Sequence, residues 1–355
     1  MKVLVTGATG AIGPRVVQAF HQAGCQIRTL AFDAPTAGMF PQDVEVVVGD
    51  VTDEAAVESA MQGVDAVVHM AALLHIVNPP PEMREKYERI NVGGTATVVE
   101  AAIKAGVRRV VLMSTIAVYG QADGQVLDEQ SPTKPVTFYA ETKLAAEKII
   151  LNARGADGQP LGAVLRLGAV YGSRIKGNYE RMMRALAGNP RNLGGNLGTQ
   201  HNFLRNLCCV PRFPFIPLGD GLNRRTLVYD KDVGRAAVLA ASHPAAAGRI
   251  FNITDGVFHT VDEIIESICS ALGRKPPRLS LPSGIVRSMA GVIEGGCHIF
   301  GLRAPITPEI VDKYTEDIAV NGSLIQNELG FELKYDLQAG WHEIIREMRY
   351  TEQSI

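Results

Sequence analysis

The chain has 355 residues, of which 35 are basic and 37 acidic, and hydrophobic residues make up 46% of it. This length predicts either two domains or one large α/β unit with an appendage, and the composition is that of a globular protein, which excludes a disordered chain. The net charge of −2 excludes a polybasic nucleic-acid binder, so we expect no nucleic-acid partner.

The first residues and the cysteines indicate the compartment. A signal peptide needs an apolar stretch of at least about seven residues, whereas the opening MKVLVTGATG has only three before a Thr-Gly break. No segment approaches a transmembrane span, so no membrane association is expected. Five cysteines without CxxC spacing argue against both a disulfide framework and a zinc site. We therefore expect a cytoplasmic protein that binds no metal.

Short apolar segments alternate with amphipathic ones along the first half of the chain. Helices are expected over residues 11–23, 53–61, 83–105 and 139–154, and the strands around them are KVLVT, QIRTLA, VEVVV, DAVVHM, RRVVLM and LGAVLRL. Near-continuous apolar strands joined by helices predict a parallel sheet covered on both faces. Right-handed crossovers make it a doubly wound α/β fold of the Rossmann type, with ligands beyond the carboxyl ends of the strands.

The second half of the chain is less regular. Residues 188–223 are rich in Gly, Asn and Pro, which predicts a loop or lid, whereas RTLVYDKDVGRAAVLAA returns to a strand and a helix, and residues 261–272 have helical periodicity. We therefore expect an interleaved, smaller C-terminal substrate domain. The predicted boundaries are 1–172 for the nucleotide-binding domain, with a return segment at about 225–255, and 173–224 with 256–355 for the substrate domain.

A glycine-rich turn, TGATGAIG, joins the first strand to the first helix. Its glycines permit a tight turn and remove side chains that would block a pyrophosphate, while the amides of the first helical turn face the anion. Strand, glycines and helix follow one another in the order of a dinucleotide site; a turn without a ligand is the alternative. The candidate cofactor-binding residues are Gly7, Gly10, Ala11, Ile12 and Gly13.

The second strand bears on the choice between NAD and NADP. An acid near its end would hold the adenosine ribose hydroxyls, whereas a basic residue there would favour a 2′-phosphate. Asp33 is the first acid after QIRTLA, and no basic residue precedes it beyond the strand. We therefore expect NAD, with Asp33 on the ribose, although Arg28 within the strand leaves NADP open and Asp33 could equally be a turn residue.

A tyrosine and a lysine open the helix predicted over residues 139–154. Tyr139 and Lys143 stand four residues apart and share a helix face, so the ammonium group can lower the pKa of the phenol and make it a proton donor or acceptor. Ser114 and Thr115 end the strand VVLM, where a hydroxyl would project over the same sheet edge towards a substrate oxygen.

These residues resemble the extended short-chain dehydrogenase/reductase family, also called the NAD-dependent epimerase/dehydratase family. The resemblance runs over essentially the whole chain and includes TGATGAIG, GDV at 49–51, HMAA at 69–72, NVGGT at 91–95, STIAVYG at 114–120, the YxxxK at 139–143, RLGAVYG at 166–172 and RTLVYDKD at 225–232. It implies that Thr115 and Tyr139 are catalytic and that Lys143 binds the nicotinamide ribose and tunes Tyr139. It also implies cofactor contacts from Asp50, Val51, Ala71, Ala72 and Asn91.

The resemblance also narrows the substrate. Family members that are 4,6-dehydratases carry an Asp-Glu pair after the catalytic threonine, but Ile116 and Ala117 stand here and can move no proton, which argues against that reaction. Arg225 matches the position of an arginine that binds the diphosphate of nucleotide sugars. With Asn178, Ser114 and Thr115 it predicts a nucleotide-sugar 4-epimerase or 4-ketoreductase, although Ala169 and Ser173 depart from the family pattern.

Other interpretations stay open. The apolar segment 283–302 suits core packing or a dimer contact, or else a lid over a hydrophobic alcohol, because the chain also resembles 3β-hydroxysteroid dehydrogenases and dihydroflavonol reductases. A non-catalytic cofactor-bound module would have lost Tyr139 or Lys143. We interpret His69, His75 and the Cys297-His298 pair as structural. Family resemblance predicts a homodimer through helices 83–105 and 139–154.

Overall fold

A seven-stranded parallel sheet forms the centre of the computed structural model, which describes residues 1–74, 76, 79–187, 217–299, 304 and 307–353. From one edge to the other, the strands are β3 (Glu45–Val48), β2 (Gln26–Ala31), β1 (Lys2–Thr6), β4 (Ala66–His69), β5 (Arg109–Thr115), β7 (Gly162–Leu167) and β11 (Ile250–Ile253). The strand order reverses between β1 and β4, and a ligand crevice is expected beyond their carboxyl ends. The predicted doubly wound α/β fold is confirmed.

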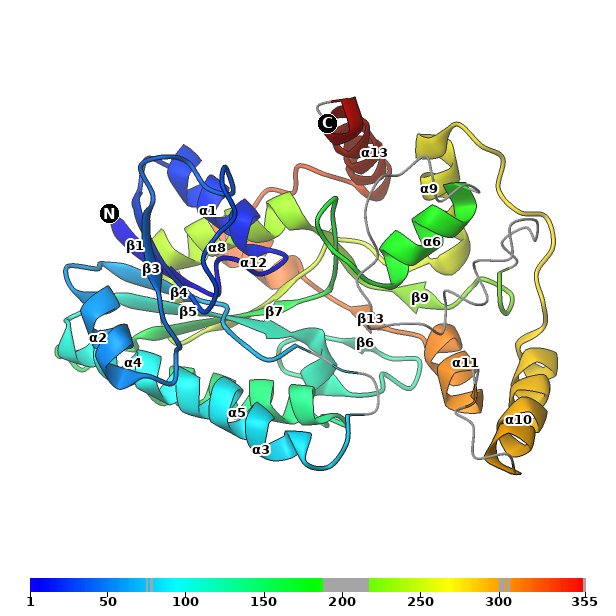
Figure 1. The fold of residues 1–355 in the computed structure, drawn as a ribbon, viewed down its shortest axis with the longest axis horizontal. Helices are drawn as coiled ribbons and strands as arrows, with labels where there is room; N and C mark the ends of the chain where they lie inside the picture. The colour runs from blue at the N-terminus through cyan, green and yellow to red at the C-terminus, as the bar shows by residue number, and fades with distance from the viewer. Residues whose placement is uncertain (75, 77–78, 188–216, 300–303, 305–306, 354–355) are drawn as a thin grey trace.

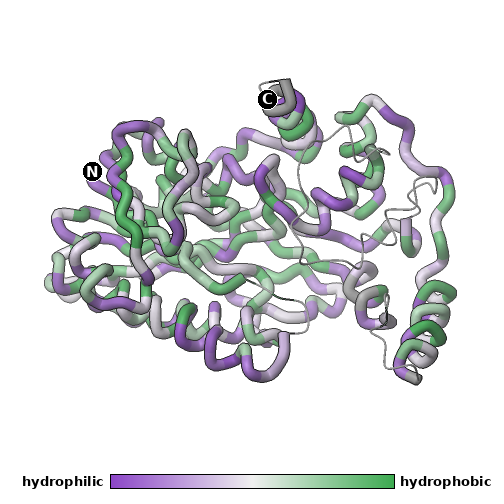
Figure 2. The backbone as a smooth tube through the Cα atoms, in the orientation of Figure 1, coloured by the Kyte–Doolittle hydropathy of each residue, from purple (hydrophilic) through white to green (hydrophobic). Residues whose placement is uncertain are grey.

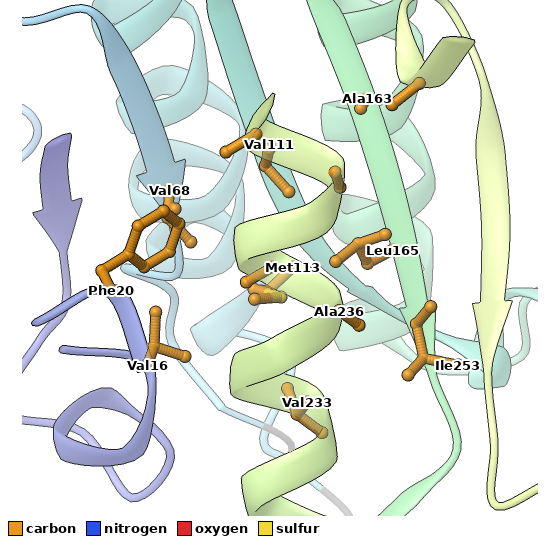
Figure 3. Close-up of a cluster of buried hydrophobic side chains, with 14 of the residues drawn as sticks. Val16, Phe20, Val68, Val111, Met113, Ala163, Leu165, Val233, Ala236 and Ile253 are labelled. Atoms are coloured by element: carbon orange, nitrogen blue, oxygen red, sulfur yellow. The ribbon is translucent and has the colours of Figure 1, made fainter. Parts of the chain in front are cut away.

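Helices cover both faces of the sheet (Figure 1). One face carries α1 (Gly13–Gln22), α8 (Asp230–Ser242) and α12 (Ser323–Leu329), and the other carries α2 (Glu54–Met61), α4 (Gly94–Lys104) and α5 (Phe138–Asn152). Side chains alternate along each strand, so Val3 and Val5 of β1 enter the first core while Leu4 enters the second. Figure 3 shows the first core, where Phe20 of α1 and Val233 of α8 meet apolar side chains of the sheet.

The helix predicted over residues 83–105 consists of three consecutive segments. α3 (Met83–Tyr87) passes into a π-helical turn (Glu88–Gly93), and α4 follows. Hydrogen bonds between residues five apart insert one extra residue into the turn, a geometry found mostly at functional sites. Here the turn carries Asn91, whose side chain is buried.

The second half of the chain adds small sheets and a further core. β8 (Ala169–Tyr171) pairs with β10 (Leu227–Tyr229), β9 (Arg224–Arg225) with β12 (His259–Thr260), and β6 (Val126–Leu127) with β13 (Ala319–Val320). Tyr171, Tyr229 and Trp341 pack in a core with α6 (Asn178–Ala187), α9 (Val261–Leu272) and α13 (Leu337–Gln353). α10 (Ser283–Ile299) and α11 (Pro308–Thr315) pack on each other beside it.

The two halves interleave. β11 and α8 from the predicted return segment complete the sheet and its first core, and Ile325, Leu329 and Phe331 enter that core as well. The stretch 323–331 therefore packs with the sheet although it lies within the predicted substrate domain; the division into domains stays a prediction. Among the helices with described positions, none is long and apolar enough to span a bilayer.

Candidate active site

The turn after β1 packs tightly against its own backbone and the loop after β4, which only glycines allow at two positions. Gly7 has φ +70°, and a Cβ on it would lie 2.7 Å from the backbone nitrogen of Ala71. A Cβ on Gly13 would lie 1.9 Å from the carbonyl oxygen of Ala8. Within the described chain, the N–H groups of Ala11 and Ile12 donate to no backbone carbonyl, so they are available to an anion at the start of α1. The turn therefore fits the pyrophosphate of a dinucleotide.

A buried histidine holds the loop after β4 against this turn. His69 Nδ1 lies 2.8 Å from Thr6 Oγ1, and His69 Nε2 lies 3.0 Å from Thr95 Oγ1. Thr6 Oγ1 also accepts from the backbone nitrogens of Met70 and Ala71, both at 3.3 Å. Ala71 and Ala72 are thereby fixed beside Gly7, where the nicotinamide half of the cofactor is expected. The structural interpretation of His69 agrees with this; His75 lies outside the described residues.

Asn91 joins that loop to the helix of the tyrosine and lysine. Its Oδ1 accepts from the nitrogen of Leu73 at 2.6 Å, and its Nδ2 donates to the carbonyl of Leu73 at 3.2 Å and to Thr142 Oγ1 at 3.0 Å. Thr142 lies between Tyr139 and Lys143 on α5. The amide of Asn91 is therefore fully engaged within the protein, and its predicted cofactor contact would have to come through the loop that it positions.

The end of β2 suits NAD. Asp33 is exposed two residues beyond the strand, where its carboxylate can meet ribose hydroxyls. Arg28, which had left NADP open, forms an ion pair with Glu45 and donates through Nη1 to the carbonyls of Ala60 and Gln62, both at 2.8 Å. It is therefore engaged within the protein and is not available for a 2′-phosphate.

Asp50 and Val51 follow the next strand. Asp50 is half-buried and accepts from the nitrogen of Thr52 at 2.9 Å. Val51 is buried, and a Cβ on Gly94 would lie 2.8 Å from its Cγ2. Both residues thus shape the wall where adenine is expected.

Thr115 ends β5 as the N-cap of a short 3₁₀ turn (Ile116–Tyr119). Its Oγ1 accepts from the nitrogen of Ala117 at 3.2 Å, and its own hydroxyl hydrogen remains to be donated to a substrate oxygen. Its side chain is half-buried, as is that of Tyr139 in the first turn of α5. Thr137 caps that turn by accepting from the nitrogen of Ala140.

Burial dominates the acid–base properties of the tyrosine and the lysine. It raises the pKa of Tyr139 to about 12, with Tyr87 adding to the rise, so the expected lowering of this pKa by Lys143 does not prevail in the protein alone. Burial lowers the pKa of Lys143 to about 8, against an opposing effect of Glu147. Burial therefore disfavours the phenolate of Tyr139 and the ammonium group of Lys143, the two charged forms that a proton-transfer mechanism uses.

The sequence interpretation missed two residues of the site, Glu147 and Arg166. Ser114, predicted to bind substrate, is buried and donates its hydroxyl hydrogen to Glu147 Oε1 at 2.5 Å, so a substrate contact would require breaking this bond. Arg166 forms a buried ion pair with the same carboxylate. The signal available in the sequence was an acid four residues after Lys143, on the face that α5 buries.

Arg225 lies on the substrate side. It is half-buried on β9, and its Nη2 donates to the carbonyl of Tyr314 at 2.8 Å. Burial raises the pKa of Tyr179 to about 12, and the charge of Arg225 opposes this rise. Tyr179 and the exposed Asn178 open α6, so the two predicted substrate residues lie in one region. Arg224, which precedes Arg225 in the sequence, forms an ion pair with Asp317 at 2.6 Å.

α10 is apolar on two sides. Val286 and Ala290 pack with Val311 of α11, as core packing requires. Met289 and Val292 are 58% and 77% exposed, and Figure 2 shows the helix largely green at one end of the molecule. Only one side of the helix is therefore explained by core packing.

Comparisons with known proteins identify the family of the chain. The profile of the NAD dependent epimerase/dehydratase family matches residues 3–254. The chain belongs to this family. Among its relatives is a 3 beta-hydroxysteroid dehydrogenase/Delta 5-->4-isomerase of Mycobacterium tuberculosis, 25% identical over 97% of this chain and 89% of that protein. Another is the N-acetyl-alpha-D-glucosaminyl-diphospho-ditrans,octacis-undecaprenol 4-epimerase of Escherichia coli O157:H7, 24% identical over 95% of this chain and 92% of that protein.

A solved structure extends the family match to the fold. MoeE5 in complex with UDP-glucose and NAD is 26% identical, with a TM-score of 0.71 over 99% of this chain and 100% of that chain. As a member of the epimerase/dehydratase family, the protein is an NAD-dependent enzyme of the extended short-chain dehydrogenase/reductase type. NAD, when bound, takes up or gives back a hydride at a substrate carbon.

Proposed function

We propose that the protein is an NAD-dependent enzyme that acts at C4 of a nucleotide sugar, as a 4-epimerase or 4-ketoreductase. Arg225 carries this proposal, because it is a half-buried guanidinium on β9 whose charge acts on Tyr179 of α6, next to the predicted substrate residue Asn178. A guanidinium fork binds the paired oxygens of a diphosphate with two hydrogen bonds. MoeE5, whose structure contains UDP-glucose, supports the substrate class.

Between the two reactions, the structure favours epimerisation. Arg28 is engaged by Glu45 and backbone carbonyls, so the site suits NAD, which an epimerase can keep through the cycle. In this scheme Thr115 donates a hydrogen bond to the reacting oxygen, and Tyr139 removes the proton from the hydroxyl and returns it after reduction on the other face. The Lys143 ammonium stabilises the phenolate and contacts the nicotinamide ribose.

The test is conversion of UDP-glucose by the purified protein, combined with identification of its bound nucleotide. Formation of UDP-galactose by a protein that retains NAD is expected. A protein that turns over only with added reduced cofactor would be a reductase. If neither UDP nor UDP-glucose binds at millimolar concentration in calorimetry, the nucleotide-sugar class is wrong.

The exposed side of α10 favours a second candidate, an enzyme that oxidises a hydrophobic alcohol. Ile285, Met289 and Val292 are exposed on one face of this helix, and the M. tuberculosis relative is a 3 beta-hydroxysteroid dehydrogenase. Such a substrate carries no phosphate and would not require Arg225. NAD reduction by dehydroepiandrosterone, with no response to UDP-glucose, would decide for this candidate.

We propose a homodimer as the assembly. α4 and α5 lie side by side on one face of the sheet (Figure 1), and outward apolar side chains such as Ile103, 38% exposed, remain to be covered. Two such helices from each protomer would make a four-helix interface. Light scattering at micromolar protein should give twice the mass of 38.2 kDa; a monomer would contradict the assembly.

A further inference from the structure

A carboxylate of α5 and a guanidinium of β7 are buried together, one helical turn beyond Lys143. The side chains of Glu147 and Arg166 are 1% and 4% exposed. Arg166 Nη2 lies 2.7 Å from Glu147 Oε2, and Arg166 Nε lies 3.1 and 3.2 Å from the two carboxylate oxygens. Ser114 Oγ donates to Oε1 at 2.5 Å. The carboxylate is therefore held in one orientation by at least three hydrogen-bond donors.

The sheet builds this pair from one row of residues. Ser114 of β5, Arg166 of β7 and Asn252 of β11 are register neighbours, so their side chains leave the same face of the sheet, towards α5. The guanidinium carbon of Arg166 also lies 4.8 Å from the centre of the Tyr119 ring, and Tyr119 donates to Asn252 Oδ1 at 2.8 Å.

A buried ion pair such as Glu147–Arg166 is an unfavourable way to stabilise a fold. Removing two charges from water costs several kcal/mol for each ion, and apolar residues of similar volume often stabilise a protein as well or better. Packing therefore does not explain why Glu147 and Arg166 are buried here, and we looked for a functional role. The neighbour on the same helix face, one turn towards the N-terminus, is Lys143.

Few groups around the buried Lys143 stabilise a positive charge on its ammonium group. It is 2% exposed, and within the described chain its ammonium group forms no hydrogen bond or ion pair. His69 of β4 is neutral, Tyr139 is uncharged at neutral pH, and Arg166 of β7 is turned onto Glu147. Arg84 of α3 pairs with Glu141 on the outer side of α5. The anion that supports Lys143 against burial is Glu147.

We propose that Glu147 is a positioning residue whose carboxylate, oriented by Arg166 and Ser114, keeps the buried ammonium group of Lys143 charged for its work beside Tyr139. The inference rests on the proposed roles of Tyr139 and Lys143 in the reaction. It assigns to Ser114 a role in orienting Glu147, in place of the expected contact with substrate.

The test uses the double variant Glu147→Gln/Arg166→Met in the NAD-bound protein. The single variant Glu147→Gln leaves Arg166 buried without its partner and would unfold for that reason alone. Removing both charges relieves this problem, so the double variant should melt close to the wild type. Lysine NMR, assigned with Lys143→Met, should then show the pKa of Lys143 lower by about one unit, the smaller end of the effect of a nearby opposite charge.

The alkaline limb of the pH profile of kcat should move to lower pH by the same amount, while the KM for substrate changes little. The matched control is Glu328→Gln/Arg249→Met, which removes an ion pair of 2.5 Å between α12 and the residue before β11; it should move neither value. An unchanged Lys143 titration in the folded double variant would overturn the inference. Because the NMR titration needs no turnover, it gives this answer even if the proposed substrate is wrong.

Discussion

The imidazole of His69 donates its Nε2 hydrogen to the hydroxyl of Thr95, 3.0 Å away. The direction follows from the next bond, because the hydroxyl hydrogen of Thr95 is already donated to the carbonyl of Asn91 at 2.6 Å. Nδ1 then accepts from Thr6. The network therefore fixes a neutral imidazole with one tautomer, and burial lowers the pKa of His69 to about 3.

This neutrality predicts a pH dependence of stability. The unfolded chain protonates this histidine below pH 6.5 and the folded chain does not, so the wild type loses stability as the pH falls. Between pH 7.5 and 5 the loss from this group is about 2 kcal/mol. His69→Gln cannot titrate and should show a pH difference smaller by that amount in urea unfolding. Equal differences for the two proteins would mean that the fold does not lower the pKa of His69.

Tyr139→Phe removes only the ionisable oxygen of the proposed acid–base residue. We expect kcat to fall by a factor of at least about 10², while the Kd for NAD in calorimetry changes little. A variant with wild-type kcat would exclude Tyr139 from proton transfer.

Lys143→Met should lower both kcat and NAD affinity, yet stabilise the fold. The folded pKa of about 8 lies below that of the unfolded chain, so burial of the ammonium costs stability below pH 8, and stability recovers as the pH rises towards 10.5. Removing the charge should raise the free energy of unfolding at pH 7.5 by about 1 to 3 kcal/mol. A less stable variant would show that the ammonium contributes to packing.

Features that depend on a local sequence pattern could be predicted from the sequence. The apolar runs at β1, β2 and β7 specify buried parallel strands, and the alternation with helices specifies their connection. Tyr139 and Lys143 were recognisable because their four-residue spacing places them on one helix face. The helix 261–272 was also predicted correctly, because its apolar period and its acidic first turn agree.

The remaining features depend on contacts between distant segments. Glu147 reads as one more surface acid until the sheet places Arg166 against it, 19 residues away. The engagement of the Asn91 amide depends on Leu73 and Thr142, which are distant from it in the sequence. The availability of Arg28 was decided by Glu45 and Ala60, which β2 brings close only in the folded protein.

Gly7→Ala tests the shape of the cofactor turn. Gly24 has nearly the same φ, +73°, but nothing within 4 Å of an added Cβ. Gly24→Ala should therefore cost only the backbone strain, about 1 to 2 kcal/mol of stability. Gly7→Ala adds the clash with Ala71 and should also reduce NAD affinity at least tenfold, measured at a temperature where both variants are folded. Equal NAD affinities would place the cofactor elsewhere.

Arg225 separates the two proposed substrate classes, and Arg224 beside it provides the control. Arg225→Leu would leave a bound diphosphate without its guanidinium, a loss of about 1.5 to 3 kcal/mol for a charged hydrogen-bond partner, so the Kd for UDP in calorimetry should rise by about ten- to a hundredfold. NAD affinity should hold, since none of the predicted cofactor-binding residues lies on β9. Arg224→Leu breaks the ion pair with Asp317 and should lower the melting temperature without changing the Kd for UDP. If both variants bind UDP as the wild type does, Arg225 does not bind the diphosphate, and the hydrophobic alcohol becomes the better candidate.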